Sequence, residues 1–101
     1  MNCNEEGFLS NPNDWNEDVA EQLAAQDQFE LNDDHFEILH LVRKFYTDYE
    51  HSPAMRPLVK FISKELGKDK GNSIYLMKLF PGSPAKFSAK YAGIPKPDKC
   101  L

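Results

Sequence analysis

Apolar residues recur at helical spacing in several stretches of the chain. Between about Asp33 and Tyr49, Phe36, Leu39 and Tyr46 trace one side of a helix, while the adjacent side carries Ile38, Leu41, Phe45 and Tyr49. Two adjacent apolar sides predict a long helix that is central to the core. The same spacing predicts four further helices, at about residues 15–25, 53–66, 73–80 and 84–92.

Helix-start and helix-stop residues separate these stretches. Asn11-Pro12-Asn13-Asp14 and Leu31-Asn32-Asp33-Asp34 are start signals, and Ser52 is expected to cap a helix with Pro53 at its first position. Gly67 ends that helix, and Pro81-Gly82-Ser83-Pro84 separates the last two. We therefore predict a mainly α fold of about five helices, in which helices 53–66 and 73–80 resemble a helix-turn-helix.

The ends of the chain do not follow the helical pattern. Residues 1–13 are polar and irregular except for Gly7-Phe8-Leu9, which is expected to form a short strand or an anchor on the core. Residues 14–92 form the predicted helical body of a single domain that spans residues 1–101. Residues 93–101 form a flexible arm, because prolines exclude regular secondary structure.

The arm carries the most distinctive candidate for chemistry. It reads Gly93-Ile94-Pro95-Lys96-Pro97-Asp98-Lys99-Cys100-Leu101, so a thiol lies one residue from the end. Gly93 suits a hinge, Pro95 and Pro97 keep the arm extended, and the eight residues after Gly93 span about 25 Å at most. We interpret Cys100 as a thiol offered to another protein. The alternative is an incidental cysteine in an ordinary chain end.

Composition narrows the class of protein. No apolar run approaches the roughly 20 residues of a membrane span, and the first residues do not resemble a signal peptide, so we expect a cytoplasmic protein with reduced thiols and no membrane partner. The spacing of its two cysteines and three histidines predicts no metal site.

The net charge of −4 is unevenly distributed along the chain: residues 1–50 hold 13 acids and two bases, and residues 51–101 hold three acids and ten bases. Such polarity favours oriented docking on a charged partner, or attraction between the two halves within one fold.

Five motifs in order resemble the DsrC/TusE sulfur-carrier family. They are residues 43–46 (Arg43-Lys44-Phe45-Tyr46), 52–60 (beginning Ser52-Pro53-Ala54-Met55), 70–76 (Lys70-Gly71-Asn72-Ser73-Ile74-Tyr75-Leu76), 79–86 (Leu79-Phe80-Pro81-Gly82-Ser83-Pro84-Ala85-Lys86), and 92–97 followed by the penultimate Cys100. The resemblance implies an orthogonal helical bundle, an N-terminal β-hairpin that is partial or missing here, a mobile C-terminal arm, and a persulfide carried on Cys100.

One departure from the family pattern bears on the reaction. Dissimilatory DsrC proteins carry a second cysteine eleven residues before the penultimate one, where this chain has Ala89. The single-cysteine pattern resembles the TusE branch, which implies a sulfurtransferase relay without a cofactor. The implied partners are a TusBCD-like sulfur donor complex and an MnmA-like thiouridylase with bound tRNA, which makes wobble 2-thiouridine.

Several residues of these motifs are candidates for docking the arm or a partner. They are Arg43, Arg56, Lys60, Lys70 and Tyr75, together with Lys96 and Lys99 beside the thiol. Ordinary solvated charges, or core and rim positions, are the alternative interpretation of this set.

Two other functions remain open at this point. A DsrC-like redox carrier associated with sulfite reductase would require Cys3 to meet Cys100 in a disulfide. A helix-turn-helix nucleic-acid binder would read bases with helix 73–80, although that helix is mostly apolar, with Lys78 its only charge.

Overall fold

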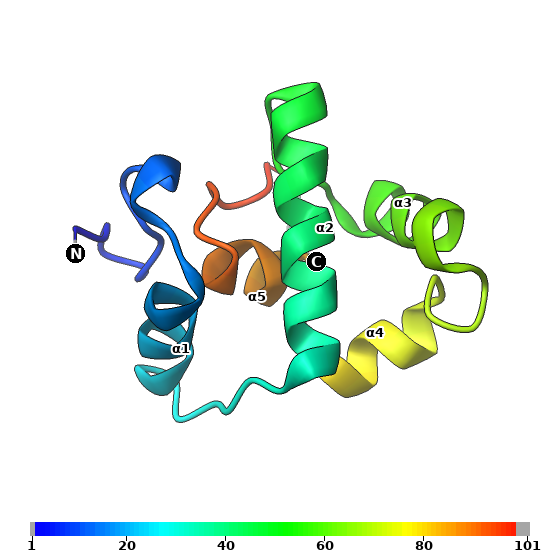
Figure 1. The fold of residues 1–101 in the computed structure, drawn as a ribbon, viewed down its shortest axis with the longest axis horizontal. Helices are drawn as coiled ribbons and strands as arrows, with labels where there is room; N and C mark the ends of the chain where they lie inside the picture. Colours follow the sequence, from blue (N-terminus) through cyan, green and yellow to red (C-terminus); the bar gives the residue numbers. More distant parts are fainter. Residues whose placement is uncertain (1, 99–101) are drawn as a thin grey trace.

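A computed structural model describes residues 2–98, so Lys99 and Cys100 lie outside the described residues. The elements are a 3₁₀ turn η1 (Pro12–Asp14) and the helices α1 (Glu17–Ala25), α2 (Asp33–Tyr49), α3 (Met55–Leu66), α4 (Ser73–Leu79) and α5 (Pro84–Tyr91). Helix α2 runs through the middle, with α1 on one side and α3 and α4 on the other (Figure 1). The five predicted helices and the mainly α class are confirmed.

Polar caps set the start of most helices. The side chains of Asn16, Asn32, Asn72 and Ser83 accept backbone N–H groups at the starts of α1, α2, α4 and α5. Each cap satisfies an N–H that the first turn leaves unpaired. The first helix was predicted to begin at about Trp15, but Asn16 caps it and α1 begins at Glu17.

The predicted cap of α3 is wrong. Helix α3 begins at Met55 with Ala54 at its cap position and without a side-chain cap. A helix that began at Pro53 would place Pro57 beyond its first turn, where the missing N–H would cost an intrahelical hydrogen bond, so the later start is favoured. Pro57 then falls in the first turn, where its missing N–H costs little. The Ser52 hydroxyl is left to donate to the carbonyl oxygen of Pro95 instead.

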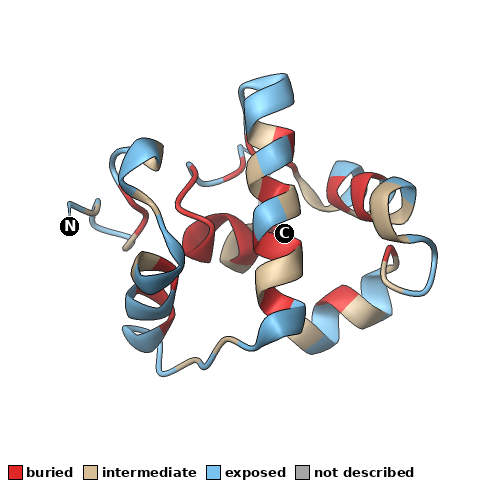
Figure 2. Ribbon diagram, viewed as in Figure 1, coloured by how far each residue is buried: buried red, intermediate tan, exposed pale blue. Residues whose placement is uncertain are grey.

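Helix α5 is the centre of the packing, although it has few large apolar residues. It packs against all four other helices, whereas the main contacts of α2 are with α3 and α5. Ala85, Ser88 and Ala89 on α5 are fully or almost fully buried, and Figure 2 shows the helix as mostly buried. Small side chains let the neighbouring helices approach α5 closely, which apolar periodicity alone does not reveal.

The N-terminal segment folds back onto the body. Cys3 and Leu9 form one antiparallel bridge, and the Asn4 side chain accepts the N–H groups of Glu6 and Phe8. Phe8 and Leu9 are buried in the core, so Gly7-Phe8-Leu9 is an anchor. The predicted short β element is present only as this bridge. Residues 2–98 contain no strand that is longer than the bridge. Among the same residues, no helix is long and apolar enough to cross a membrane.

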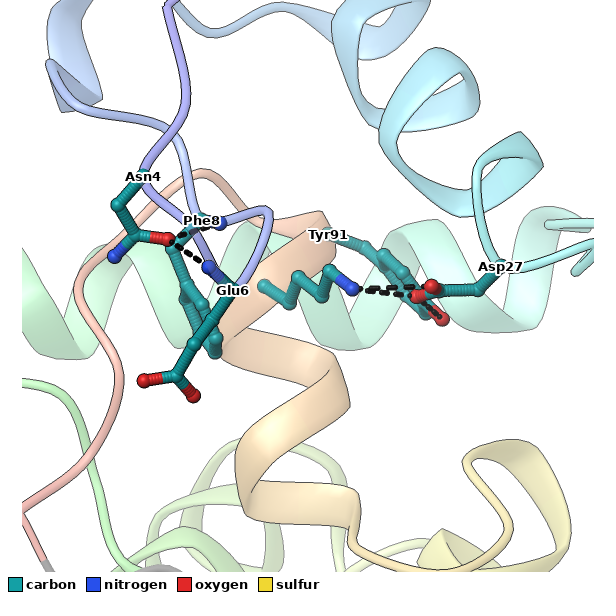
Figure 3. A network of polar contacts seen from close by, with 6 residues as sticks. Asn4, Glu6, Phe8, Asp27 and Tyr91 are labelled. Atoms are coloured by element: carbon teal, nitrogen blue, oxygen red, sulfur yellow. Dashed lines mark hydrogen bonds and ion pairs between the residues drawn. The ribbon is translucent and has the colours of Figure 1, made fainter.

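An ion pair between a buried lysine and a partly exposed aspartate joins the loop after α1 to α5. Lys90 Nζ lies 2.8 Å from Asp27 Oδ2, and the Tyr91 hydroxyl donates to the same oxygen at 2.8 Å (Figure 3). The Lys90 side chain is only 9% exposed. Burial acts to raise the pKa of Asp27, but the hydrogen bonds from Lys90 and Tyr91 outweigh it and lower that pKa below its ordinary value. Burial and the Asp27 carboxylate raise the pKa of Tyr91.

We expect Asp27→Asn to destabilise the fold by about 3 kcal/mol at neutral pH, because it leaves the Lys90 ammonium buried without its counter-charge. The pKa of Asp27 is lower in the folded than in the unfolded chain. The contribution of Asp27 to the free energy of unfolding is therefore complete above pH 3.8, the ordinary pKa of aspartate. This contribution is lost as the pH falls through the pKa of Asp27 in the folded chain. Urea unfolding at several pH values should show the gap between wild type and variant closing under acid. A constant gap would contradict this account.

Candidate functional site: the clamp on the C-terminal tail

The described part of the predicted arm lies against the body. Residues 94–98 have no helix or strand, as the prolines predict. Ile94 and Pro97 are buried, whereas Pro95, Lys96 and Asp98 are exposed. This segment determines where the chain leaves the body on its way to Cys100.

Three side chains hold three backbone carbonyl groups at the base of the arm. Trp15 Nε1 donates to the carbonyl oxygen of Tyr91 at 2.8 Å, and Arg43 Nη1 donates to that of Ala92 at 2.7 Å. The hydroxyl of Ser52 donates to that of Pro95. We call Trp15, Arg43 and Ser52 the tail clamp. It draws on three separate parts of the chain and fixes the start of the arm.

Arg43 is the central member of the tail clamp. Its Nη2 donates to the carbonyl oxygen of Pro12 at 3.0 Å, and its guanidinium carbon lies 4.4 Å from the centre of the Trp15 ring. Burial lowers the pKa of Arg43 from its ordinary value. Because Arg43 is occupied on several sides, it suits holding the arm better than docking a second protein.

Gly93 lies between the clamped carbonyls of Ala92 and Pro95, and two features of its surroundings require glycine. Its φ of +72° lies in the left-handed region, which disfavours residues with a side chain. A Cβ at this position would meet Trp15 Cδ1 at 2.5 Å. The ring of Trp15 therefore packs directly on the turn from α5 into the arm.

The predicted docking residues within residues 2–98 differ in their surroundings. Lys70 pairs with Glu37 at 2.7 Å, and Lys96 pairs with Glu6 at 2.8 Å. The Tyr75 hydroxyl is buried and, within residues 2–98, has no hydrogen-bond partner, so burial raises its pKa. Arg56 and Lys60 are exposed on α3, apart from these pairs. The prediction of a docking role for each stays a prediction.

Sequence reasoning missed the histidine that joins α2 to α4. His35, which was given no role, accepts the Asn32 N–H at Nδ1 at 3.1 Å. Its Nε2 lies 2.8 Å from the carbonyl oxygen of Leu79, so it donates there when Nδ1 is the acceptor. A capping pattern in residues 32–35 was the available signal, although histidine is an unusual residue for that place.

Position 89, where the resemblance places the second cysteine of dissimilatory DsrC proteins, lies directly under the start of the arm. Ala89 is fully buried in α5, and its carbonyl oxygen accepts the Ile94 N–H at 3.1 Å. The arm thus begins beside this position, and the residue here carries no thiol. Cys3 is half-buried at the opposite end of the chain.

The fold and the site together define a class of protein: a small helical domain that clamps the base of a C-terminal tail. The chain belongs to the DsrC-like family: the family model described as "DsrC like protein" matches residues 1–101. The predicted family is therefore confirmed.

Named relatives match nearly the whole chain. A protein of Buchnera aphidicola called "Sulfurtransferase TusE" is 52% identical over 95% of this chain and 84% of its own length. A "Sulfurtransferase TusE homolog" of Haemophilus influenzae is 50% identical over 100% of this chain and 93% of its own.

Solved structures share the fold. The NMR structure of Allochromatium vinosum DsrC has a TM-score of 0.88 and 48% identity, covering 98% of this chain and 88% of its own. The oxidized γ-subunit of the dissimilatory sulfite reductase (DsrC) from Archaeoglobus fulgidus has a TM-score of 0.83 and 39% identity, covering 100% of this chain and 92% of its own.

Proposed function

We propose that this protein is a sulfur carrier that accepts sulfane sulfur as a persulfide on Cys100. It passes that sulfur to a tRNA thiouridylase for wobble 2-thiouridine synthesis. The observation that carries the proposal is the high identity to proteins named sulfurtransferase TusE, in a chain whose arm holds a single thiol. The partners would be a TusBCD-like donor complex and an MnmA-like thiouridylase with tRNA. A cytoplasmic location follows from this role, since tRNA is modified there.

The chemistry needs one thiolate and no net oxidation. The Cys100 thiolate attacks the outer sulfur of a donor persulfide, the bond between the two donor sulfurs breaks, and the donor thiolate leaves. A sulfur–sulfur bond forms on Cys100, and its outer sulfur keeps the proton or loses it to water. An acceptor thiolate then attacks this outer sulfur and regenerates the Cys100 thiolate. The protein acts as a sulfurtransferase only together with its partner enzymes.

The tail clamp supports such a relay by limiting where the thiol can go. Three residues lead from Pro97 to Cys100, and they span about 10 Å at most. With the arm held through Pro97, a partner would find the thiol within a small volume beside the tail clamp. An arm that samples fewer positions loses less conformational entropy when it docks on a partner.

A DsrC-like redox carrier is the second candidate, and one contact favours it. The Lys96–Glu6 pair brings the arm against the N-terminal segment that holds Cys3. An oxidised sample should then migrate faster than a reduced one on a non-reducing gel, and Cys3→Ser should abolish the difference. Identical migration of both wild-type samples would exclude this candidate.

Base reading by α4 receives little support from its exposed side chains, of which only Ser73 and Lys78 can form hydrogen bonds. Ile74 is 70% exposed and Met77 is 44% exposed, and both are apolar. A recognition helix would present hydrogen-bonding side chains there. The helix-turn-helix arrangement is thus better explained as packing.

A reconstituted relay tests the proposed function. Donor complex, thiouridylase, tRNA and ATP would be combined with and without this protein, and 2-thiouridine would be measured by liquid chromatography and mass spectrometry. Thiolation that depends on this protein supports the proposal. Equal thiolation without it, at limiting donor, would refute the carrier role.

A further inference from the structure

Three basic side chains form a row along the exposed face of α3. Arg56, Lys60 and Lys64 follow one another at four-residue spacing and are all exposed. Residues four apart lie on one face of a helix, about 6 Å apart along its axis. We call these residues the basic ridge. None of the three has an ion pair within residues 2–98, whereas the acid of the same helix, Glu65, pairs with Lys44.

An aromatic hollow lies beside the basic ridge. Lys60 and Lys64 line a hollow of about 230 Å³ together with Phe45, Tyr49, Pro57 and Phe61. Tyr49 is 53% exposed, and its ring centre lies 4.6 Å from that of Phe45. An accessible aromatic ring next to unpaired cations is the combination that binds single-stranded nucleic acid, through base stacking and phosphate contacts.

The basic ridge lies on the other side of α2 from the acids of α1 and begins near the tail clamp, while the exposed acids Asp48 and Glu50 flank Tyr49 in the chain. The exposed acids Glu17, Asp18 and Glu21 are on α1, on the other side of α2 from α3 (Figure 1). Ser52, which holds the arm through Pro95, precedes Arg56 by only four residues. A polyanion attracted to the ridge would therefore lie near the base of the arm and away from the acids of α1.

We propose that the basic ridge and the aromatic hollow bind single-stranded RNA, with phosphates on Arg56, Lys60 and Lys64 and an unpaired base stacked on Tyr49. This inference rests on the proposed function, in which tRNA is the final sulfur acceptor. Cations spaced along one helix beside an accessible ring offer phosphate contacts and a stacking surface together, and this combination favours RNA. The contact would bring the arm to the RNA that receives the sulfur.

Fluorescence anisotropy of the full-length protein with a labelled oligouridine of about ten nucleotides, a length that one single-strand groove binds, tests the inference. Lys60→Gln and Lys64→Gln should each weaken binding and reduce the slope of log affinity against log salt by about 0.7. Tyr49→Ala should weaken binding at least about five-fold and leave the salt slope unchanged. Lys78→Gln on α4 removes the same charge elsewhere and should have little effect.

Three results would overturn the inference. One is equal loss of affinity in Lys78→Gln and the ridge variants, which would indicate non-specific attraction. Another is competition by polyglutamate as strong as that by RNA, without an effect of Tyr49→Ala. The third is weaker binding of the ridge variants to thiouridylase free of tRNA, with oligouridine affinity unchanged, which would assign the ridge to a protein partner.

The proposed function and this inference can fail separately. The ridge variants should accept sulfur from a persulfide donor at the wild-type level, and Cys100→Ser should bind oligouridine normally. Failure of the wild-type protein to accept sulfur would refute the carrier role, whereas the measured affinity for oligouridine would still test the RNA site.

Discussion

Replacement of Cys100 by serine is expected to abolish sulfur transfer in the reconstituted relay while the fold persists. A serine hydroxyl has nearly the same size as a thiol, but it forms no persulfide and is not ionised at neutral pH. Because the substitution hardly changes the size of the side chain, the free energy of unfolding should change by less than about 0.5 kcal/mol. Thiolated tRNA should fall to the level seen without the protein.

Cys3→Ser is the matched control, because it removes the other thiol of the chain. It should keep wild-type transfer, since Cys3 takes no part in a single-thiol relay. Transfer retained by Cys100→Ser but lost in Cys3→Ser would move the chemistry to the N-terminal segment. Loss in both variants would favour the two-thiol redox mechanism.

Replacement of Gly93 by alanine is expected to destabilise the fold by about 3 kcal/mol. The left-handed backbone costs a residue with a Cβ roughly 1–2 kcal/mol. The added carbon would also lie 2.5 Å from Trp15, and relieving such overlap typically costs a further 1–3 kcal/mol. The variant should also weaken the tail clamp, since Trp15 would have to move away from the carbonyl of Tyr91.

Gly67→Ala separates the two contributions. Gly67 has a similar φ of +91°, but a Cβ there would meet no atom within 4 Å. Its variant should lose only the backbone term, about 1–3 kcal/mol, because a ψ of 172° places Gly67 in a region that is nearly restricted to glycine. Urea unfolding gives both values, and hydrogen exchange of the Ile94 amide reports on the arm. This amide should exchange faster in Gly93→Ala and at the wild-type rate in Gly67→Ala, and equal exchange in the two variants would contradict direct packing of Trp15 on Gly93.

The helices were predictable from local pattern, because each buries a stripe whose period is visible in a short window. Their starts were less predictable where prolines crowd together, as Ser52 shows. The wide stripe of α2 was visible in sequence, whereas the central role of α5 was not. Alanine and serine give no periodic apolar signal, although their small size is what lets other helices pack on α5.

The tail clamp was largely invisible in the sequence. Its acceptors are backbone carbonyls, which every residue has, and its donors lie 76, 49 and 43 residues away along the chain. Arg43 was a docking candidate only because it belongs to a motif of the resembling family. Trp15 was predicted as the first residue of a helix, and nothing local indicated its hydrogen bond to the carbonyl of Tyr91.

Intact-protein mass spectrometry is the most direct test of the central claim that Cys100 carries sulfur. The reduced protein would be incubated with a persulfide donor and fragmented in the spectrometer without added reductant. We expect one additional sulfur atom, confined to fragments that contain Cys100, present in Cys3→Ser and removed by dithiothreitol. No added sulfur, or sulfur confined to fragments that contain Cys3, would contradict the account.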